Sequence, residues 1–111
     1  MLEKKQTGDD IVVNLKGRLD VHLSAEIERG LLETIDEAPK SNIIVNMKDV
    51  EYMSSSGLRV LVATMRQLKQ RQRNLRLCHL NQAVRKVFEV VELIDMFEVF
   101  ETEEEAIAAQ S

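Results

Sequence analysis

Residues 49–61 read Asp-Val-Glu-Tyr-Met-Ser-Ser-Ser-Gly-Leu-Arg-Val-Leu and join two segments of different periodicity. The run before them, residues 43–47, is almost unbroken in apolar side chains, which is typical of a strand buried on both faces. After the serines, apolar residues recur at helical spacing, and polar residues lie outside that stripe. The stripe consists of Leu58, Leu61, Val62, Met65 and Leu68. The stretch therefore predicts a buried strand, a serine-rich corner and an amphipathic helix.

Strands and helices are expected to alternate along the rest of the chain. Expected strands lie at residues 2–6, 11–16, 43–47, 74–80 and 97–100, with Gly17 closing the second. Expected helices follow the capping residues Ser24, Asn81 and Thr102 and the three serines, and Pro39 ends the first helix. The helix after Asn81 is expected to bury Val84, Val87, Phe88 and Val91. The order β-β-α-β-α-β-α-β-α predicts an α/β fold: a mixed β-sheet of about four to five strands with a parallel centre, packed by about four helices.

The composition fits one small folded domain, expected to span residues 1–111. Hydrophobic residues make up 44% of the chain and charged residues 31%, which provides apolar surface for a single core. The single cysteine, Cys78, excludes an internal disulfide and is expected to be a small core residue. No apolar run is long enough to cross a bilayer, and the first residues lack a signal-peptide core. We therefore expect a cytoplasmic protein with no membrane partner.

Charge is segregated along the chain. Residues 59–86 carry 8 basic and no acidic side chains, whereas residues 87–111 carry 8 acidic and no basic ones. A basic stretch can mark a nucleic-acid site. The formal net charge is −4, however, and the basic stretch contains no aromatic residue to stack on bases. We therefore expect no nucleic-acid partner, and the stretch is either a rim for an acidic protein partner or a solvated face.

Common catalytic and metal-binding motifs are absent from the sequence. It contains neither the Gly-x-Ser-x-Gly of a nucleophile elbow nor the Gly-x-x-x-x-Gly-Lys of a phosphate-binding loop. Its two histidines and one cysteine do not form a zinc pattern. His79 is expected at the surface, and His22 either lines the same surface as Ser55 or is an exposed loop residue. We therefore expect no catalytic residue, cofactor or metal in this chain.

The sequence resembles the STAS domain, named for sulfate transporters and anti-sigma-factor antagonists, along nearly the whole chain. That family is marked by a strand followed by Asp-Ser-Ser/Thr-Gly-Leu and a helix, and residues 54–58 match it except that Ser54 takes the aspartate's place. Residues 17–20 resemble the family's Gly-x-Leu-Asp turn, residues 43–46 its central strand, and residues 84–97 its late Val…Phe…Leu…Phe pattern. The absence of a transmembrane segment favours the stand-alone antagonist branch.

The resemblance implies that Ser55, the residue after the aspartate position, is phosphorylated, with Ser56 as the second choice. The neutral Ser54 leaves open which of the three serines is modified and how a kinase recognises them. The resemblance also implies a surrounding partner-binding surface, formed by Asp20, Ser54, Ser56, Gly57, Leu58, Arg59 and Val60. Asp20 is in addition a candidate helix-entry residue, and Gly57 would let a partner's backbone approach closely.

The function implied by the resemblance is that of a bacterial, phosphorylation-controlled partner-switching regulator in signal transduction and transcription. The unphosphorylated protein would bind a serine kinase/anti-sigma factor or a related target, and phosphorylation of Ser55 would release it. A metal-dependent serine phosphatase would restore the unphosphorylated form, and the protein itself would be a monomer or weak dimer. Two alternatives stay open: a non-switching STAS scaffold or interaction module, and a STAS domain that binds a small ligand at the serines.

A serine at a strand-to-helix junction is also physically suited to carry a phosphate. The first turn of a helix leaves main-chain N–H groups unpaired and carries the positive end of the helix dipole. A phosphate adds roughly −1.5 to −2 charges, which such a terminus can accommodate. We therefore expect phosphorylation to act by repulsion and desolvation at an interface, not by unfolding. Arg59 would either neutralise part of that phosphate or face the partner.

Overall fold

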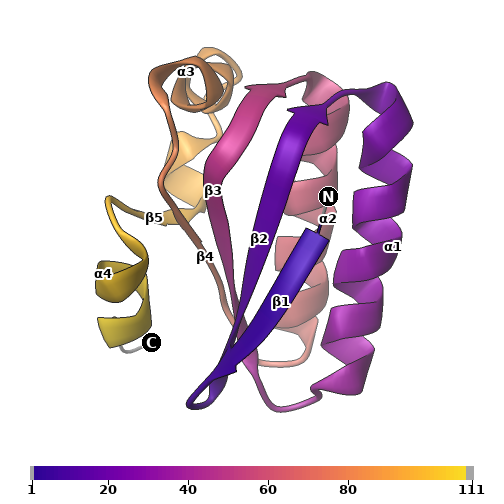
Figure 1. Cartoon of the computed structure of the whole chain (residues 1–111), viewed down its shortest axis with the longest axis vertical. Helices are drawn as coiled ribbons and strands as arrows, with labels where there is room; N and C mark the ends of the chain where they lie inside the picture. Colours follow the sequence, from indigo (N-terminus) through magenta and orange to yellow (C-terminus); the bar gives the residue numbers. More distant parts are fainter. Residues whose placement is uncertain (1, 110–111) are drawn as a thin grey trace.

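The computed structural model describes residues 2–109, and its strands form one twisted sheet (Figure 1). The strands are β1 (Leu2–Thr7), β2 (Asp10–Leu19), β3 (Asn42–Met53), β4 (Leu75–Cys78) and β5 (Glu98–Phe100). The helices are α1 (Val21–Glu37), α2 (Ser55–Gln70), α3 (Gln82–Val90) and α4 (Glu103–Ala108), and a 3-10 helix, η1 (Ile94–Met96), precedes β5. The predicted order of strands and helices is confirmed, with η1 added.

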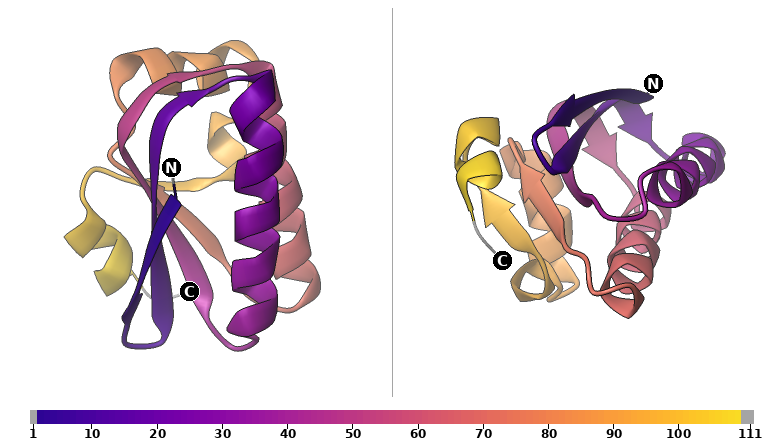
Figure 2. Two further views of the ribbon diagram at one scale, coloured as in Figure 1. Left: turned by 45° about the vertical axis from the view of Figure 1, so that its right-hand side comes forward. Right: turned by 90° about the horizontal axis from the view of Figure 1, so that it is seen from below.

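The sheet is mixed, as predicted. Its strand order is β1-β2-β3-β4-β5, in which β1 runs antiparallel to β2 and all other neighbours are parallel. Helices α1, α2 and α3 pack on one face and α4 packs on the other (Figure 2). The parallel strands β2 and β3 therefore end at the same edge of the sheet, and each leads directly into a helix.

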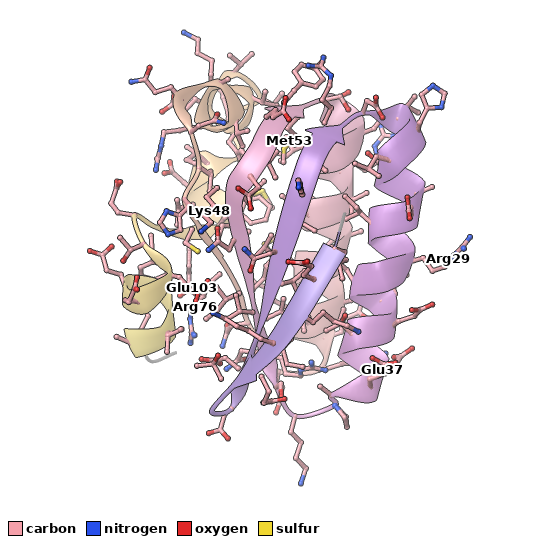
Figure 3. All side chains as sticks on the ribbon, viewed as in Figure 1. Arg29, Glu37, Lys48, Met53, Arg76 and Glu103 are labelled. Carbon is pink, nitrogen blue, oxygen red and sulfur yellow. The ribbon has the colours of Figure 1, made fainter. Side chains whose placement is uncertain are left out.

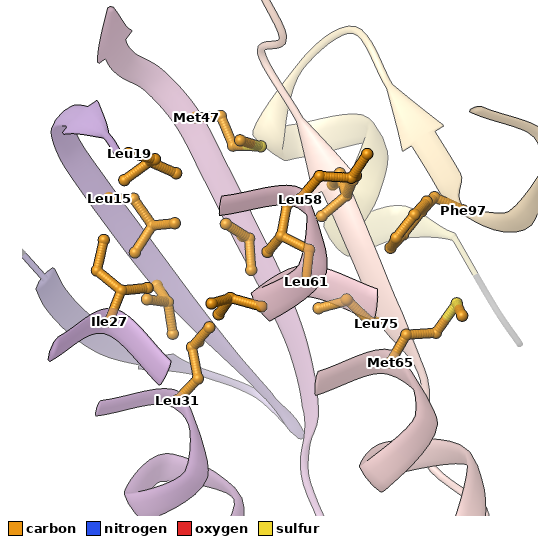
Figure 4. Packing of buried hydrophobic residues seen from close by; sticks show 14 of the residues in the cluster. Leu15, Leu19, Ile27, Leu31, Met47, Leu58, Leu61, Met65, Leu75 and Phe97 are labelled. Carbon is orange, nitrogen blue, oxygen red and sulfur yellow. The ribbon is translucent and has the colours of Figure 1, made fainter. Parts of the chain in front are cut away.

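The main core lies between the sheet and helices α1 to α3 (Figure 4). The apolar run at residues 43–47 is buried throughout, as predicted for the central strand. On α2 the predicted stripe is buried at Leu58, Leu61, Met65 and Leu68, while Val62 is half-buried. The rings of Phe88 and Phe97 close the core edge-to-face, with centroids 5.3 Å apart.

The structure corrects two predictions near the end of β2. Gly17 does not close the strand: at φ +103° it lies where the pairing of β2 with β3 shifts register, and the strand continues to Leu19. Helix α1 then begins at Val21 and is capped by Asp20 instead of the predicted Ser24. Ser24 is buried inside the helix, where its Oγ donates to the Asp20 carbonyl oxygen at 2.6 Å. The longer strand carries Asp20 to the edge of the sheet.

The caps of the later helices agree better with the prediction. Asn81 caps α3, because its Oδ1 accepts from the Val84 N–H at 2.8 Å. Thr102 caps α4 by accepting from the Glu105 N–H at 3.1 Å. Val91 was expected in the core but is 43% exposed, since α3 ends before it. β3 runs well past residue 47, whereas β4 and β5 are shorter than predicted.

Helix α4 is attached to the second face of the sheet through Glu103 (Figure 3). The Glu103 carboxylate pairs with Lys5 Nζ at 2.9 Å and accepts from Asn46 Nδ2 at 2.9 Å. Beneath the helix lies a small apolar cluster, formed by Val12, Ile44, Cys78 and Ala106. The helix therefore covers this second cluster and is held by an ion pair, by hydrogen bonds from Asn46 and Arg76, and by apolar contacts.

Cys78 was predicted in the core and His79 at the surface, and only the first prediction holds fully. Cys78 is the small core residue expected, and burial raises the pKa of its thiol to about 12. The prediction of a surface position for His79 is only partly right. His79 is half-buried, and its Nε2 accepts from the main-chain N–H of Glu103 at 3.3 Å. Its ring thus helps to hold the start of α4.

Candidate functional site

The carboxyl ends of β2 and β3 place two helix starts at one edge of the sheet (Figure 1). Leu19 and Met53 are the last paired residues of the two strands. The next residues along the chain, Asp20 and Ser54, cap α1 and α2, and these two helices pack against each other. We call Asp20 and the three serines Ser54, Ser55 and Ser56 the serine corner. The fold thus brings Asp20 and the serines to one edge of the sheet.

Asp20 is held as an ionised cap. Its Oδ1 accepts from the main-chain N–H groups of His22 and Leu23, both at 3.0 Å. The hydrogen bond from Leu23 is the main cause that lowers the pKa of Asp20, and the bond from His22 acts in the same direction. Asp20 therefore has the helix-entry role that the sequence predicted. His22 itself is exposed at the start of α1.

Ser54 connects α2 to the neighbouring strand. Its main-chain N–H and its Oγ both donate to the Leu19 carbonyl oxygen, at 3.0 and 2.9 Å. The same Oγ accepts weakly from the Gly57 N–H at 3.4 Å, as in an N-cap. The half-buried Ser54 hydroxyl is thus engaged both as donor and as acceptor. An ionised carboxylate in this position could accept from the helix but could not donate to Leu19.

Three residues predicted to contact a partner lie inside the protein. A Cβ on Gly57 would come within 2.9 Å of Leu19 Cβ and 3.0 Å of the Leu19 carbonyl oxygen. The close approach that Gly57 permits is therefore to the chain's own strand β2, not to a partner's backbone. Leu58 is 3% exposed and Val60 is 7% exposed, because both belong to the core. The exposed part of the predicted surface is correspondingly smaller.

Ser55 and Ser56 form the first turn of α2 and differ in exposure. Ser55 is exposed, whereas Ser56 is half-buried. Within residues 2–109 neither hydroxyl has a hydrogen-bond partner. Their main-chain N–H groups begin the helix and have no intrahelical acceptor, so this turn favours an anion.

A shallow groove runs between α1 and α2 next to these serines. It is lined by Val21, Ser24, Ala25, Glu28, Ser56, Arg59 and Val60. Arg59 is exposed and forms no ion pair with any residue that the structure describes. Val21 is 64% exposed and lies at the start of α1. The groove therefore combines apolar contact area with one unpaired cation.

Sequence reasoning missed three features of this edge. The Leu19 carbonyl is a main-chain group, so no residue type signals its role. The exposure of Val21 follows from the start of α1 at this residue, whereas the sequence predicted a start after Ser24. The guanidinium of Arg18 lies over the ring of Tyr52, 4.5 Å from its centroid, because the bulge in β2 brings these residues opposite each other. Only the register of β2 with β3 could have revealed that contact.

Metal-ligating clusters and membrane-spanning helices are not found in the part of the chain that the structure describes. Among residues 2–109, no group of three or more His, Cys, Asp or Glu side chains could hold a metal ion. None of the described helices has the length and apolar character needed to span a membrane.

Comparison with known proteins identifies relatives of the chain. The sequence pattern of the family described as "STAS domain" matches residues 1–106. The chain is 30% identical over 87 residues to the anti-sigma-B factor antagonist of Bacillus subtilis (strain 168), and the match covers 78% of each protein. It is 32% identical over 83 residues to the anti-sigma-B factor antagonist of Staphylococcus epidermidis, covering 74% of this chain and 76% of that protein.

Solved structures show the same architecture. The anti-sigma factor antagonist SpoIIAA in its unphosphorylated form superposes with a TM-score of 0.81 at 29% identity, covering 96% of this chain and 93% of that one. The phosphorylated form of the Bacillus cell fate determinant SpoIIAA gives a TM-score of 0.73 at 29% identity and covers 96% of each chain. The mixed sheet and the helices that pack on it are therefore shared with these structures.

Proposed function

Because the chain belongs to the STAS domain family, we propose that it is an anti-sigma factor antagonist that changes partners when Ser55 is phosphorylated. In its unphosphorylated form the serine corner binds a serine kinase/anti-sigma factor, and the phosphorylated form is released. The observation that carries the proposal is the exposed Ser55 hydroxyl on the first turn of α2. Further support comes from the relatives, which are named anti-sigma factor antagonists.

Hydrogen bonding and exposure distinguish the three serines as phosphate acceptors. The Ser54 hydroxyl donates to the Leu19 carbonyl, and a kinase would have to break that bond to use it. Ser56 is half-buried and lines the groove between α1 and α2. Ser55 is exposed and its hydroxyl is unengaged within residues 2–109. These differences support Ser55 as the acceptor and Ser56 as the second choice.

A phosphate on Ser55 would leave the fold intact. The bonds that hold the corner run through Ser54 and Asp20 and do not involve the Ser55 hydroxyl. The first-turn N–H groups and the helix dipole offset part of the added charge. The new charge and its water shell then act on a partner packed against the corner, which loses its contacts. The switch therefore works at the interface.

The partner surface that we propose is formed by the exposed and half-buried residues around Ser55. It retains Asp20, Ser54, Ser56 and Arg59 of the predicted set and adds Val21. Gly57, Leu58 and Val60 support this surface from inside. Arg59 shares the groove with Ser56, so we assign its side chain to partner contact.

We also propose where the protein works and which enzymes act on it. The chain, a single domain over residues 1–111, would be a substrate and a ligand in the bacterial cytoplasm and not an enzyme. ATP belongs to the kinase, and the catalytic metal belongs to a metal-dependent serine phosphatase that removes the phosphate. No nucleic acid takes part at the serine corner.

Phosphate mapping tests the site. The kinase is captured from a lysate of the source bacterium on immobilised wild-type protein and then incubated with Mg-ATP and free protein. Mass spectrometry should locate phosphate on Ser55 in the wild type and in Ser56→Ala, and none on Ser55→Ala. Phosphate on Ser56, or outside Ser54–Ser56, would contradict the assignment.

Binding measurements test the switch. Ser55→Asp should weaken binding to the captured kinase by about tenfold or more, which corresponds to about 1.4 kcal/mol, and should leave the helical circular dichroism unchanged. Ser41→Asp, which adds the same charge in the loop between α1 and β3, is the matched control and should bind like the wild type. Equal binding by Ser55→Asp and wild type would refute the repulsion mechanism.

A further inference from the structure

The end of α3 and the following η1 leave large apolar side chains in solvent. Val90 is 69% exposed, Val91 43% and Met96 41%. These three residues lie within one short stretch at the end of the helix, and we call them, with the acidic residues beside them, the acidic corner. Such clustering is a usual mark of an interaction surface, whereas single exposed apolar residues are not.

The acidic corner is framed by three exposed carboxylates. Glu89, Glu92 and Asp95 are all exposed, and none forms an ion pair with another residue in the range 2–109. Glu92 adopts φ +59°, a left-handed conformation at a helix end where glycine is usual. The chain thus carries a charged side chain at a position that favours glycine. The main-chain N–H of Glu92 donates to the Glu89 carbonyl oxygen at 3.0 Å, and its carboxylate forms no ion pair with residues 2–109.

The outer face of α2 has the opposite charge. Arg59, Arg66 and Lys69 are exposed, and none of them pairs with a carboxylate of the described residues. Val62 and Ala63 are half-buried and lie between Arg59 and Arg66 at helical spacing. We call these five residues the basic strip. The basic strip therefore has cations around a small apolar centre. The acidic corner likewise has carboxylates around apolar side chains.

The two surfaces lie on neighbouring helices. Helices α2 and α3 contact each other and pack on the same face of the sheet (Figure 2). In a two-fold dimer, the acidic corner of each copy can therefore meet the basic strip of the other. Contact between two acidic corners would instead bring like charges together. We propose that a second copy of this chain covers the acidic corner in this way. The contact shares only Arg59 with the partner surface proposed around Ser55.

Sedimentation equilibrium of the full chain tests the proposal. At low ionic strength, the average mass should rise from the 12.7 kDa of one chain toward twice that value as the protein concentration increases toward about 1 mM. Raising the ionic strength from about 0.01 M to about 1 M should weaken the association by about tenfold or more, because salt screens exposed charges. A mass of 12.7 kDa at every concentration and ionic strength would overturn the proposal.

Charge-reversal variants provide the decisive comparison. Arg66→Glu/Lys69→Glu changes the basic strip without touching Arg59, and Glu92→Lys/Asp95→Lys changes the acidic corner. Each variant alone should stay at the mass of one chain, and an equimolar mixture of the two should recover the dimer. Arg29→Glu/Lys40→Glu reverses two exposed charges outside both surfaces and should associate like the wild type.

The mixture also separates self-association from other roles of these surfaces. Circular dichroism should show that all variants are folded. A folded mixture that stays monomeric would overturn the proposal, as would equal dissociation of the control. If Glu92→Lys/Asp95→Lys lost a different protein partner while the mass of the wild type was already that of one chain, the acidic corner would bind that protein and not a second copy. Phosphate mapping at Ser55 is independent of every one of these outcomes.

Discussion

At the scale of single residues, the Ser54 hydroxyl supports both the start of α2 and the end of β2. Ser54→Ala removes its bonds to the Leu19 carbonyl and the Gly57 N–H. We expect the free energy of unfolding to fall by about 1 kcal/mol, the usual cost of losing an N-cap. Ser55→Ala should stay within about 0.5 kcal/mol of the wild type, because that hydroxyl is exposed. Urea denaturation followed by circular dichroism measures both, and equal effects would contradict this role for Ser54.

Gly57 lies where a side chain would collide with β2. Gly57→Ala would place a Cβ 2.9 Å from Leu19 Cβ and 3.0 Å from a main-chain oxygen that cannot move freely. We expect a loss of about 1 to 3 kcal/mol in unfolding free energy. Gly30→Ala is the matched control within a helix, because its Cβ meets only the flexible end of Leu2. That variant should be neutral or gain up to about 1 kcal/mol from helix propensity, and a ranking of the two in the opposite order would refute the packing role of Gly57.

At the scale of elements, local capping patterns predicted some boundaries correctly and failed at others. Asn81 and Thr102 cap their helices as predicted. Each side chain accepts a hydrogen bond from the main-chain N–H three residues later. Ser24 also fits a capping pattern, but the bulge at Gly17 extends β2 and lets Asp20 cap first. Sequence thus predicted the succession of strands and helices along the chain and the position of the three serines at the start of a helix. The bond from Ser54 to the Leu19 carbonyl depends on strand pairing, which no local pattern contains.

Helix α4 gives a prediction about local opening. It covers Cys78, and Glu103 attaches it through Lys5 and Asn46. Glu103→Ala should expose the thiol more often and speed its reaction with a disulfide reagent by about tenfold, if opening becomes about 1.4 kcal/mol easier. Glu104→Ala removes an exposed charge that, like Glu103, raises the pKa of the Cys78 thiol, but it leaves the attachment of α4 intact, so its labelling should speed up far less. The labelling rate under native conditions is the measurement, and equal rates for all three proteins would show that Glu103 does not hold the helix.

At the scale of the whole molecule, two carboxylates link stability to pH. A hydrogen bond from the Leu23 N–H lowers the pKa of Asp20 from its usual 3.8. A hydrogen bond from Lys5 lowers the pKa of Glu103 from its usual 4.5. The folded state therefore binds fewer protons, so this contribution is complete above about pH 4.5 and is lost as the pH falls through the lowered values. Asp20→Asn/Glu103→Gln should show a flatter fall of unfolding free energy between about pH 5 and pH 2. Urea titrations at several pH values measure this, and parallel curves for variant and wild type would contradict it.

The attachment of Ser54 to Leu19 has a consequence for how an enzyme would recognise the neighbouring hydroxyl. The two bonded residues are far apart in sequence, so the shape around Ser55 exists only when β2 and β3 are paired. A kinase acting here would meet an ordered helix start that is fixed by a neighbouring strand. A synthetic peptide copied from residues 49–61 would contain every side chain of the motif without this shape. Such a kinase would therefore phosphorylate the intact domain and not a short peptide of the same sequence.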